Sequence, residues 1–230
     1  GLNFTIPQIM VALNDSNFSV CTDCTNLSYD NDTGTFIFNV SHFTTYSVRE
    51  FVADAPAEDT NVSYCKILNL NDTTYTLSQS INSSGTCLTV NASNVAIDCK
   101  GYSINYSRIF DGYGINVTGF NGATIKNCIV NQAGPTSSST AGMYIRDSSA
   151  ARIINNTINS TDGTTVYLKN ALNNNISNNT LIGGWKGVYL EFGSQGNRVE
   201  GNNFTGTIEG ILIQSCSNNV FYRNYFHQGG

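Results

Sequence analysis

The chain has 230 residues, of which 12% are charged, and its formal net charge is −5 at pH 7. Lys and Arg residues form no cluster, which argues against nucleic acid as a partner. No apolar run approaches the roughly 18 residues that a membrane helix needs, so we predict no membrane-spanning segment. The sequence starts without an initiator Met or a charged and apolar leader, and we expect a mature or trimmed fragment.

Residues 1–55 are predicted to form a small β-sandwich piece. The stretches "FTIPQIMVAL", "NFSV", "TFIFNV" and "TTYSVREFV" are typical of short strands, and "NDTG" is typical of a hairpin turn. "TGTFIFNVSHFTTYSV" resembles the closing hairpin of immunoglobulin-like modules in surface proteins. Four strands fall short of the about seven of a complete sandwich. Either the natural chain continues before Gly1, or another subunit supplies the missing strands.

The rest of the sequence repeats, after a linker that we place at residues 56–64 because "ADAPAEDTN" is rich in Pro, Asp and Ala. Strand-like starts recur at "CLTV" (87–90), "GINV" (114–117), "GMYI" (142–145), "TVYL" (165–168), "GVYL" (187–190) and "GILI" (210–213), 22 to 28 residues apart. Each repeat carries a second strand-like stretch, with Gly, Asn, Ser and Asp between them. A fixed period of this length is typical of a solenoid. We predict an all-β chain in which a right-handed parallel β-helix of about six rungs occupies residues 65–230.

Alternation along each strand predicts the core of this β-helix. The first strands of the rungs point Met143, Ile145, Val166, Leu168, Val188, Leu190, Ile211 and Ile213 inward, and the second strands add Ile153, Ile176, Val199 and Phe221. A further apolar column consists of Ile158, Leu181, Phe204 and Phe226.

Asparagine recurs two residues before that further column. Asn156, Asn179, Asn202 and Asn224 occupy equivalent positions, so we expect their side-chain amides to stack from rung to rung as a structural ladder. In "NNT" the second Asn is then buried, and the first, Asn155 or Asn178, must face outward if it carries a glycan.

"SGTCLTVNASNVAIDCKGYSI", followed by "ATIKNCIVNQ" and "ARIINNTI", closely resembles the right-handed parallel β-helix repeat proteins of cell surfaces, many of them archaeal. The resemblance covers residues 61–230. It implies the fold and leaves the function open, because this scaffold carries lyases, epimerases, adhesins and structural proteins.

Seven cysteines indicate an oxidising compartment. Cys99 and Cys128 come at the same corner of consecutive rungs, close enough for a disulfide. A bond between Cys65 and Cys87 would tie the strand that enters the β-helix to its first rung. The seventh, Cys216, is either buried and inert or available for an intersubunit bond.

Cys21 and Cys24 form a C-x-x-C motif. A redox motif needs a helix N-terminus to lower the thiol pKa, and this one sits between strands. A zinc site needs a second pair of ligands with suitable spacing. We therefore predict a small structural disulfide.

The motif N-x-[ST] is over-represented. With 32 Asn and 47 Ser or Thr, chance gives about 6 or 7 such sequons, and the chain has 17. They lie at Asn3, Asn14, Asn17, Asn26, Asn31, Asn39, Asn61, Asn71, Asn82, Asn91, Asn105, Asn116, Asn155, Asn159, Asn175, Asn178 and Asn203. We predict covalent N-glycans at these sites and an extracellular protein.

Catalytic residues are sparse. Lyases and epimerases on this scaffold combine clustered carboxylates that bind Ca²⁺ with a Lys, Arg, His or Tyr base. The outward column Thr118, Arg146, Lys169, Glu191, Gln214 holds one carboxylate, and Asp147 is followed in its column by Asn170 and Phe192. Asp98 and Asp111 are the remaining candidates, with turn capping as the alternative role, and the two histidines are His42 and His227. We predict no enzyme, no metal site and no cofactor.

One outward feature suggests a contact. Tyr144, Tyr167 and Tyr189 are expected to stack on the exposed face of the first strands. They either stabilise the sheet by cross-strand contact or form a strip that binds sugar rings or a neighbouring subunit.

The last rung runs to "NYFHQGG" without a capping element. An uncapped β-helix exposes strand edges, so either a cap was lost or the next subunit is the cap, which would build a filament. We predict a structural extracellular glycoprotein of a cell surface that assembles with copies of itself into a filament, sheath or surface layer. Two alternatives stay open: an adhesin that binds surface polysaccharide, and a polysaccharide lyase or epimerase-like enzyme.

Overall fold

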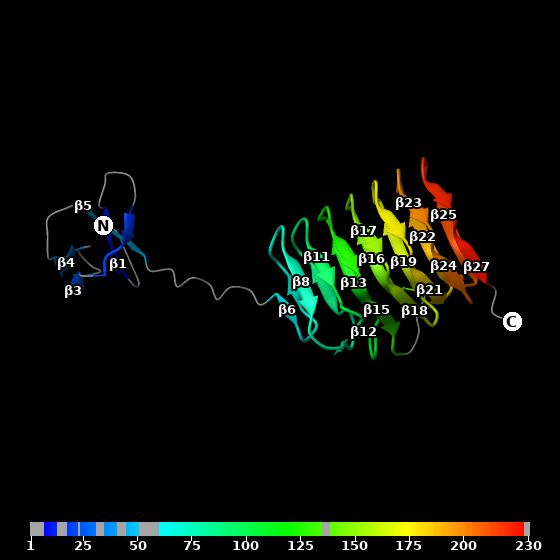
Figure 1. The fold of residues 1–230 in the computed structure, drawn as a ribbon, viewed down its shortest axis with the longest axis horizontal. Coiled ribbons are helices and arrows are strands. Elements are labelled where there is room, and N and C mark those ends of the chain that lie inside the picture. Colours follow the sequence, from blue (N-terminus) through cyan, green and yellow to red (C-terminus); the bar gives the residue numbers. More distant parts are fainter. Residues whose placement is uncertain are drawn as a thin grey trace. The chain divides into compact units, whose positions relative to one another are not determined.

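The computed structural model describes residues 7–12, 18–22, 24–30, 35–40, 45–50, 60–134 and 139–227 (Figure 1). The chain divides into two compact units, residues 1–58 and 59–230. Every regular element in the described residues is a β-strand, which confirms the predicted all-β fold. Across those ranges, no helix is long and apolar enough to cross a membrane.

The first unit contains two antiparallel groups of strands. β1 (Pro7–Ala12) pairs with β2 (Phe18–Val20) and β5 (Thr45–Glu50), and β3 (Thr25–Asp30) pairs with β4 (Thr35–Asn39). Four of the five strands follow the predicted stretches, whereas β3, with the polar sequence TNLSYD, was not predicted. The immunoglobulin-like character of this unit stays a prediction.

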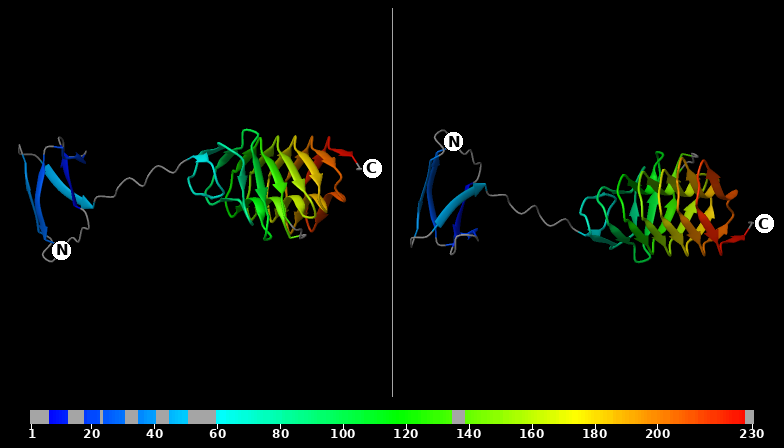
Figure 2. Two further views of the ribbon diagram at one scale, coloured as in Figure 1. Left: turned by 90° about the horizontal axis from the view of Figure 1, so that it is seen from below. Right: turned by 90° about the horizontal axis from the view of Figure 1, so that it is seen from above.

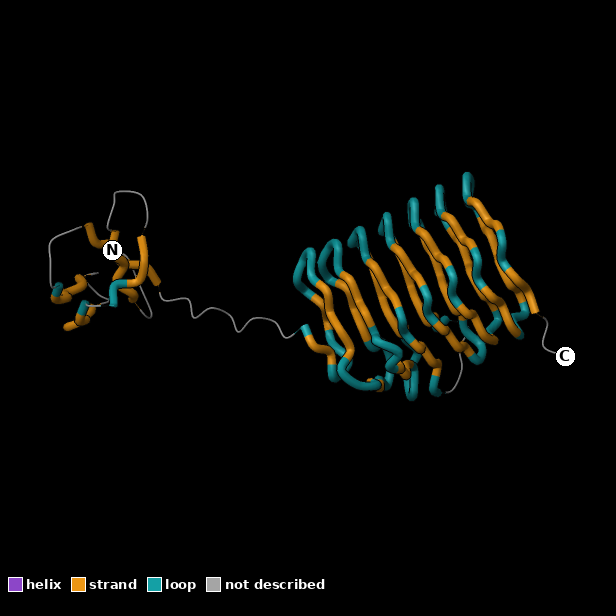
Figure 3. Tube along the Cα trace, in the orientation of Figure 1, coloured by secondary structure: helices purple, strands orange, loops and turns teal. Residues whose placement is uncertain are grey.

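The second unit is a parallel β-helix built from three sheets, each of which takes one strand from every turn (Figures 2 and 3). The first sheet consists of β7 (Ile67–Leu68), β10 (Leu88–Val90), β13 (Tyr113–Thr118), β16 (Ala141–Arg146), β19 (Thr164–Lys169), β22 (Lys186–Glu191) and β25 (Glu209–Gln214). The second consists of β6 (Asn61–Val62), β8 (Thr74–Leu77), β11 (Ala96–Asp98), β14 (Thr124–Lys126), β17 (Arg152–Ile154), β20 (Asn175–Ser177), β23 (Arg198–Glu200) and β26 (Val220–Tyr222). The third consists of β9 (Ile81–Asn82), β12 (Ser103–Tyr106), β15 (Ile129–Gln132), β18 (Thr157–Ser160), β21 (Thr180–Gly183), β24 (Asn203–Thr205) and β27 (Tyr225–His227).

These strands make seven turns, from β7–β9 to β25–β27, and all inter-turn pairs are parallel. The predicted parallel β-helix is therefore confirmed, with one turn more than the aligned repeats suggested, because the first turn precedes "CLTV". β6 lies within the segment predicted as a linker and pairs with β8.

The core forms where alternation predicted it. Met143, Ile145, Ile153, Val166, Leu168, Ile176, Val188, Leu190 and Val199 are all completely buried. The further apolar column is the inward row of the third sheet, in which Ile158, Leu181 and Phe204 are buried and in register. In the seventh turn the same columns are only partly covered, as at Ile211, Ile213, Phe221 and Phe226.

The glycine that opens "GVYL" is required by close packing. A Cβ on Gly187 would meet the carbonyl oxygen of Gly210 and lie 2.6 Å from a ring carbon of Phe204. A glycine inside a strand often marks such a close approach. Gly142 and Gly210 occupy the same position under similar close contacts, whereas the fifth turn has Thr165 there.

The predicted asparagine ladder is present at the second corner, between the second and third sheets. The Asn156 Nδ2 donates to Asn179 Oδ1 at 3.0 Å, Asn179 to Asn202 at 3.0 Å, and Asn202 to Asn224 at 3.1 Å. Backbone N–H groups donate to the same oxygens. As expected, the first Asn of each "NNT", Asn155 and Asn178, is exposed and the second is buried.

Sequence analysis missed a second ladder, at the first corner, between the first and second sheets. The Asn174 Nδ2 donates to Asn197 Oδ1 at 2.8 Å, and Asn197 donates to Asn219 at 3.0 Å. At both corners the residue before the ladder has positive φ, for example Asn178 at 56° and Asn173 at 54°. Asn and Gly tolerate this left-handed conformation best, which explains the Asn-Asn step of the repeat.

The structure contains the three predicted disulfides. Cys65–Cys87 joins the first two turns of the β-helix, Cys99–Cys128 joins the second and third, and Cys21–Cys24 lies in the first unit. Cys128 also takes the place of a ladder residue, because its backbone N–H donates to Asn156 Oδ1 at 2.9 Å. Cys216 is the free thiol among the described residues; it is half-buried, and its Sγ lies 3.2 Å from the carbonyl oxygen of Gln214.

Candidate functional site

The outer face of the first sheet carries the predicted tyrosine column. Alternation along β16, β19 and β22 places Tyr144, Tyr167 and Tyr189 directly opposite one another. Their ring centroids are 5.0 and 4.8 Å apart. Tyr113 extends the stack, 4.4 Å from Tyr144, although Asn116 is the residue in register there. Tyr113 was missed because it lies outside the aligned column.

The expected exposure of this column was wrong. Tyr144 and Tyr189 are only 8% and 7% exposed, and Tyr167 is half-buried. The rings cover one another along the column, and the Lys186 ammonium lies 4.1 Å from the centroid of the Tyr189 ring. The rings of Tyr144 and Tyr189 therefore offer little open face, and the sugar or subunit contact of this column stays a prediction.

Hydrogen bonds fix the hydroxyl groups at the edge of the stack. The Tyr167 hydroxyl donates to Glu191, whose carboxylate also lies 3.6 Å from the Lys169 ammonium, and the Tyr189 hydroxyl donates to Gln214 at 2.6 Å. Burial, and then the bond to Glu191, raises the pKa of Tyr167. Burial, with the Glu191 charge, raises the pKa of Tyr189 to about 12. At neutral pH these phenols are protonated donors.

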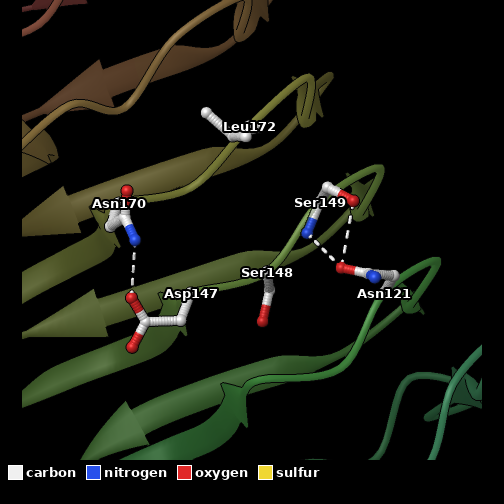
Figure 4. A pocket seen from close by; sticks show the side chains of 6 residues that line it. All are labelled: Asn121, Asp147, Ser148, Ser149, Asn170 and Leu172. Atoms are coloured by element: carbon white, nitrogen blue, oxygen red, sulfur yellow. Dashed lines mark hydrogen bonds between the residues drawn. The ribbon is translucent and has the colours of Figure 1, made fainter.

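Beside the first sheet, the first corner forms a polar pocket of about 290 Å³ (Figure 4). It is lined by Asn121, Asp147, Ser148, Ser149, Asn170 and Leu172. Asn170 Nδ2 donates to Asp147 Oδ1 at 2.8 Å, and the Ser149 N–H and hydroxyl donate to Asn121 Oδ1 at 2.7 and 3.0 Å. The bond from Asn170 lowers the pKa of Asp147, although partial burial opposes it.

A second pocket of about 340 Å³ continues along the same corner. Its lining is Leu172, Asn173, Gln195, Gly196 and Asn218. Leu172 belongs to both pockets, and its backbone bridges to Ser149 on one side and to Gln195 on the other. The two pockets therefore follow the axis of the β-helix from turn to turn.

The candidate acids lie apart from these pockets. Asp98 Oδ1 accepts from Asn127 and from the Lys100 N–H, both at 3.0 Å, and Oδ2 lies 3.4 Å from the Lys126 ammonium. Burial opposes ionisation, but these contacts outweigh it and lower the pKa of Asp98. Asp98 thus caps its corner, and Asp111 is exposed. In the described part of the chain, no three His, Cys, Asp or Glu side chains gather as a metal site requires. His227 is exposed on β27, and His42 lies outside the described residues.

The sequon asparagines with described side chains are exposed or half-buried. Among the described side chains Asn39, Asn61, Asn71, Asn82, Asn91, Asn155 and Asn178 are exposed, and Asn105, Asn116, Asn159, Asn175 and Asn203 are half-buried. Asn3, Asn14, Asn17, Asn31 and the side chain of Asn26 lie outside the described residues. On the third sheet Asn105 donates to Asn82 at 2.8 Å, Asn131 to Asn105 at 2.9 Å and Asn159 to Asn131 at 2.6 Å. A glycan leaves one N–H on its amide, so this outer ladder and glycosylation are compatible.

A family model described as "Right handed beta helix region" matches residues 93–230. Among solved structures, the chain is similar to the crystal structure of the Dettilon tailspike protein (gp208), with 12% identity and a TM-score of 0.33, over 71% of this chain and 54% of that one. The chain thus spans about half the length of that tailspike chain. Its sequence matches none of the curated proteins. The family match covers more than half of the chain and falls on the parallel turns described above, so the chain belongs to the family of right-handed β-helix proteins.

Proposed function

We propose that this chain is a structural extracellular glycoprotein of a cell surface that assembles head to tail with copies of itself into a filament, sheath or surface layer. The observation that carries the proposal is the apolar end of the β-helix. Phe226 is 55% exposed in the seventh turn, whereas Phe204, one turn earlier in the same column, is 1% exposed. One more layer of strands would bury it in the same way.

The two ends of the β-helix offer complementary strand edges. β25, β26 and β27 are the last strands of their sheets, and β7 and β9 end the first and third sheets at the opposite side. Leu70 in the first turn is exposed, as is Ile213 in the seventh, whereas the inward residues Leu68, Tyr75 and Leu77 of the first turn are buried. If the seventh turn of one copy pairs with the first turn of the next, the first and third sheets continue across the joint with parallel strands. Because such a contact joins different surfaces, it repeats without closing and gives a filament.

The proposed location is supported by the covalent chemistry of the chain. Disulfides persist in oxidising compartments, and three of them are present. Seven sequon asparagines with described side chains are exposed, as an N-glycan requires. The role is mechanical: hydrogen-bonded sheets, amide ladders and disulfides make a stiff rod, and we assign no catalytic step.

Negative-stain electron microscopy of the secreted, unboiled protein tests the proposal. We expect filaments or sheets with a regular repeat, formed by a protein whose intact mass exceeds the 24.9 kDa of the polypeptide because of glycans. Phe226→Asp should abolish assembly, since it places a charge in the joint. Ile109→Asp is the matched control, because it alters an exposed apolar side chain on the side of the β-helix. Dispersed particles at every concentration, or filaments that survive Phe226→Asp, would overturn head-to-tail assembly.

A further inference from the structure

The first corner holds one residue that departs from the pattern of its column. Asp147, Asn170, Phe192 and Ser215 all have positive φ, at 48°, 47°, 46° and 56°. Short polar side chains tolerate this conformation, whereas a bulky aromatic residue there is an outlier. Burial does not offset the strain, because the Phe192 side chain is 56% exposed. Strained residues that persist on a surface are concentrated at functional sites.

The ring of Phe192 is held in place from one side. The Lys169 ammonium lies 4.8 Å from the ring centroid, and Lys169 is itself paired with Glu191 at 3.6 Å. Such a cation–π contact orients a ring on an otherwise open surface. The rest of the ring stays accessible, unlike the rings of Tyr144 and Tyr189.

The two polar pockets follow the same corner. The side-chain amides of Asn173, Gln195 and Asn218, and the Nδ2 of Asn121, make no hydrogen bond to another described residue. The Asp147 carboxylate is paired with Arg146 at 3.0 Å, so it adds an oriented acceptor and no net charge. None of the amides that line the pockets belongs to a sequon, so no N-glycan of the chain is attached within them.

From this arrangement we propose that the first corner of the β-helix, around Phe192, Leu172 and the two pockets, binds a neutral polysaccharide. An open apolar ring beside amide and carboxylate groups provides the stacking surface and the hydrogen bonds that sugar hydroxyls need. The cations nearest the ring are paired, which favours an uncharged ligand. The pockets repeat along the axis, so a polymer of repeating units fits them better than a single sugar. The site lies on the side of the β-helix, and Asn218 is the residue of the pocket lining that belongs to the seventh turn.

Native affinity electrophoresis tests the site. The protein is run through gels that contain dextran, mannan or laminarin, which are neutral, or alginate, which is acidic. We expect retardation in at least one neutral gel and none in alginate. Phe192→Gly should migrate as in a blank gel while its Tm rises by about 2 °C, because Gly relieves the left-handed strain. Gln195→Ala should reduce the retardation several-fold at unchanged Tm.

Lys100→Gly is the matched control. Lys100 also has positive φ, at 53°, but at the second corner of the second turn, away from the proposed joint. The substitution should raise Tm in the same way and leave the retardation intact. The proposal is overturned by no retardation in any neutral gel, by retardation in alginate alone, or by full retardation of both Phe192→Gly and Gln195→Ala.

Discussion

Asn179 uses every hydrogen-bonding group of its side chain. Its Oδ1 accepts from the N–H and the Nδ2 of Asn156 at 2.9 and 3.0 Å, and its Nδ2 donates to Asn202 Oδ1 at 3.0 Å and to the Ile153 carbonyl at 2.9 Å. Asn131, in the outer ladder, makes one bond in each direction and is half-buried. Asn179 therefore satisfies buried polar groups, whereas Asn131 bonds to groups that water can also reach.

This contrast predicts unequal losses on truncation. Asn179→Ala should lower the free energy of unfolding by about 3 kcal/mol, because it leaves more than one buried polar group without a partner. Asn131→Ala should cost less than about 1 kcal/mol, since water replaces its partners. Urea denaturation at constant m-value measures both. Equal losses for the two variants would contradict the assignment of Asn179 as a buried ladder residue.

At the scale of the strand, the tyrosine column links packing to pH. Burial raises the pKa of Tyr144, Tyr167 and Tyr189, for Tyr189 to about 12, above the value of about 10 in an unfolded chain. Between these values the unfolded chain binds fewer protons than the folded one. The stability that these raised pKa values contribute is therefore complete below about pH 10 and is lost as the pH rises further, for Tyr189 through a pKa of about 12.

Spectrophotometric titration of tyrosinate tests this coupling. We expect part of the 12 tyrosines to ionise only together with loss of β-sheet circular dichroism, well above pH 10. Tyr167→Phe should reduce the number of tyrosines that ionise in the late step, and the other tyrosines of the column should still ionise late. Tyr64→Phe is the control, because it removes an exposed ring outside the column. If every tyrosine ionises in one early step while the β-sheet signal persists, the column is not packed as described.

The strands also show which parts of the fold could be predicted from the sequence. The first sheet was predicted from stretches of four alternating residues, and Met143, Val166 and Val188 landed in one buried column. The third sheet was seen only as an apolar column, because strands such as β24 (Asn203–Thr205) hold one inward side chain and show no alternation. The site at the first corner could not be predicted, because the positive φ of Phe192 depends on the backbone, and nothing in the residue type signals it.

The whole β-helix is reinforced unequally along its axis. Cys65–Cys87 and Cys99–Cys128 join turns one to three, whereas turns four to seven are connected by hydrogen bonds and packing alone among the described residues. By the loop-entropy estimate, closing loops of 22 and 29 residues stabilises a protein by about 3.5 kcal/mol each. Solenoid stability is approximately a sum over neighbouring turns, so this stabilisation should stay local.

Hydrogen exchange with and without a thiol reductant measures that locality. In the oxidised protein, below the concentration at which it assembles, we expect the seventh turn, β25 to β27, to exchange fastest, because its core residues are partly exposed and it has a neighbour on one side only. Reduction should lower the protection of β7 to β15 and leave β16 to β24 nearly unchanged. Cys99→Ser with Cys128→Ser should reproduce the loss in turns two and three, whereas Cys21→Ser with Cys24→Ser, in the other unit, should leave the β-helix unaffected. A uniform loss across all seven turns would instead mean that the β-helix opens as one cooperative block, so that the first disulfides stabilise even the distant end proposed as the joint.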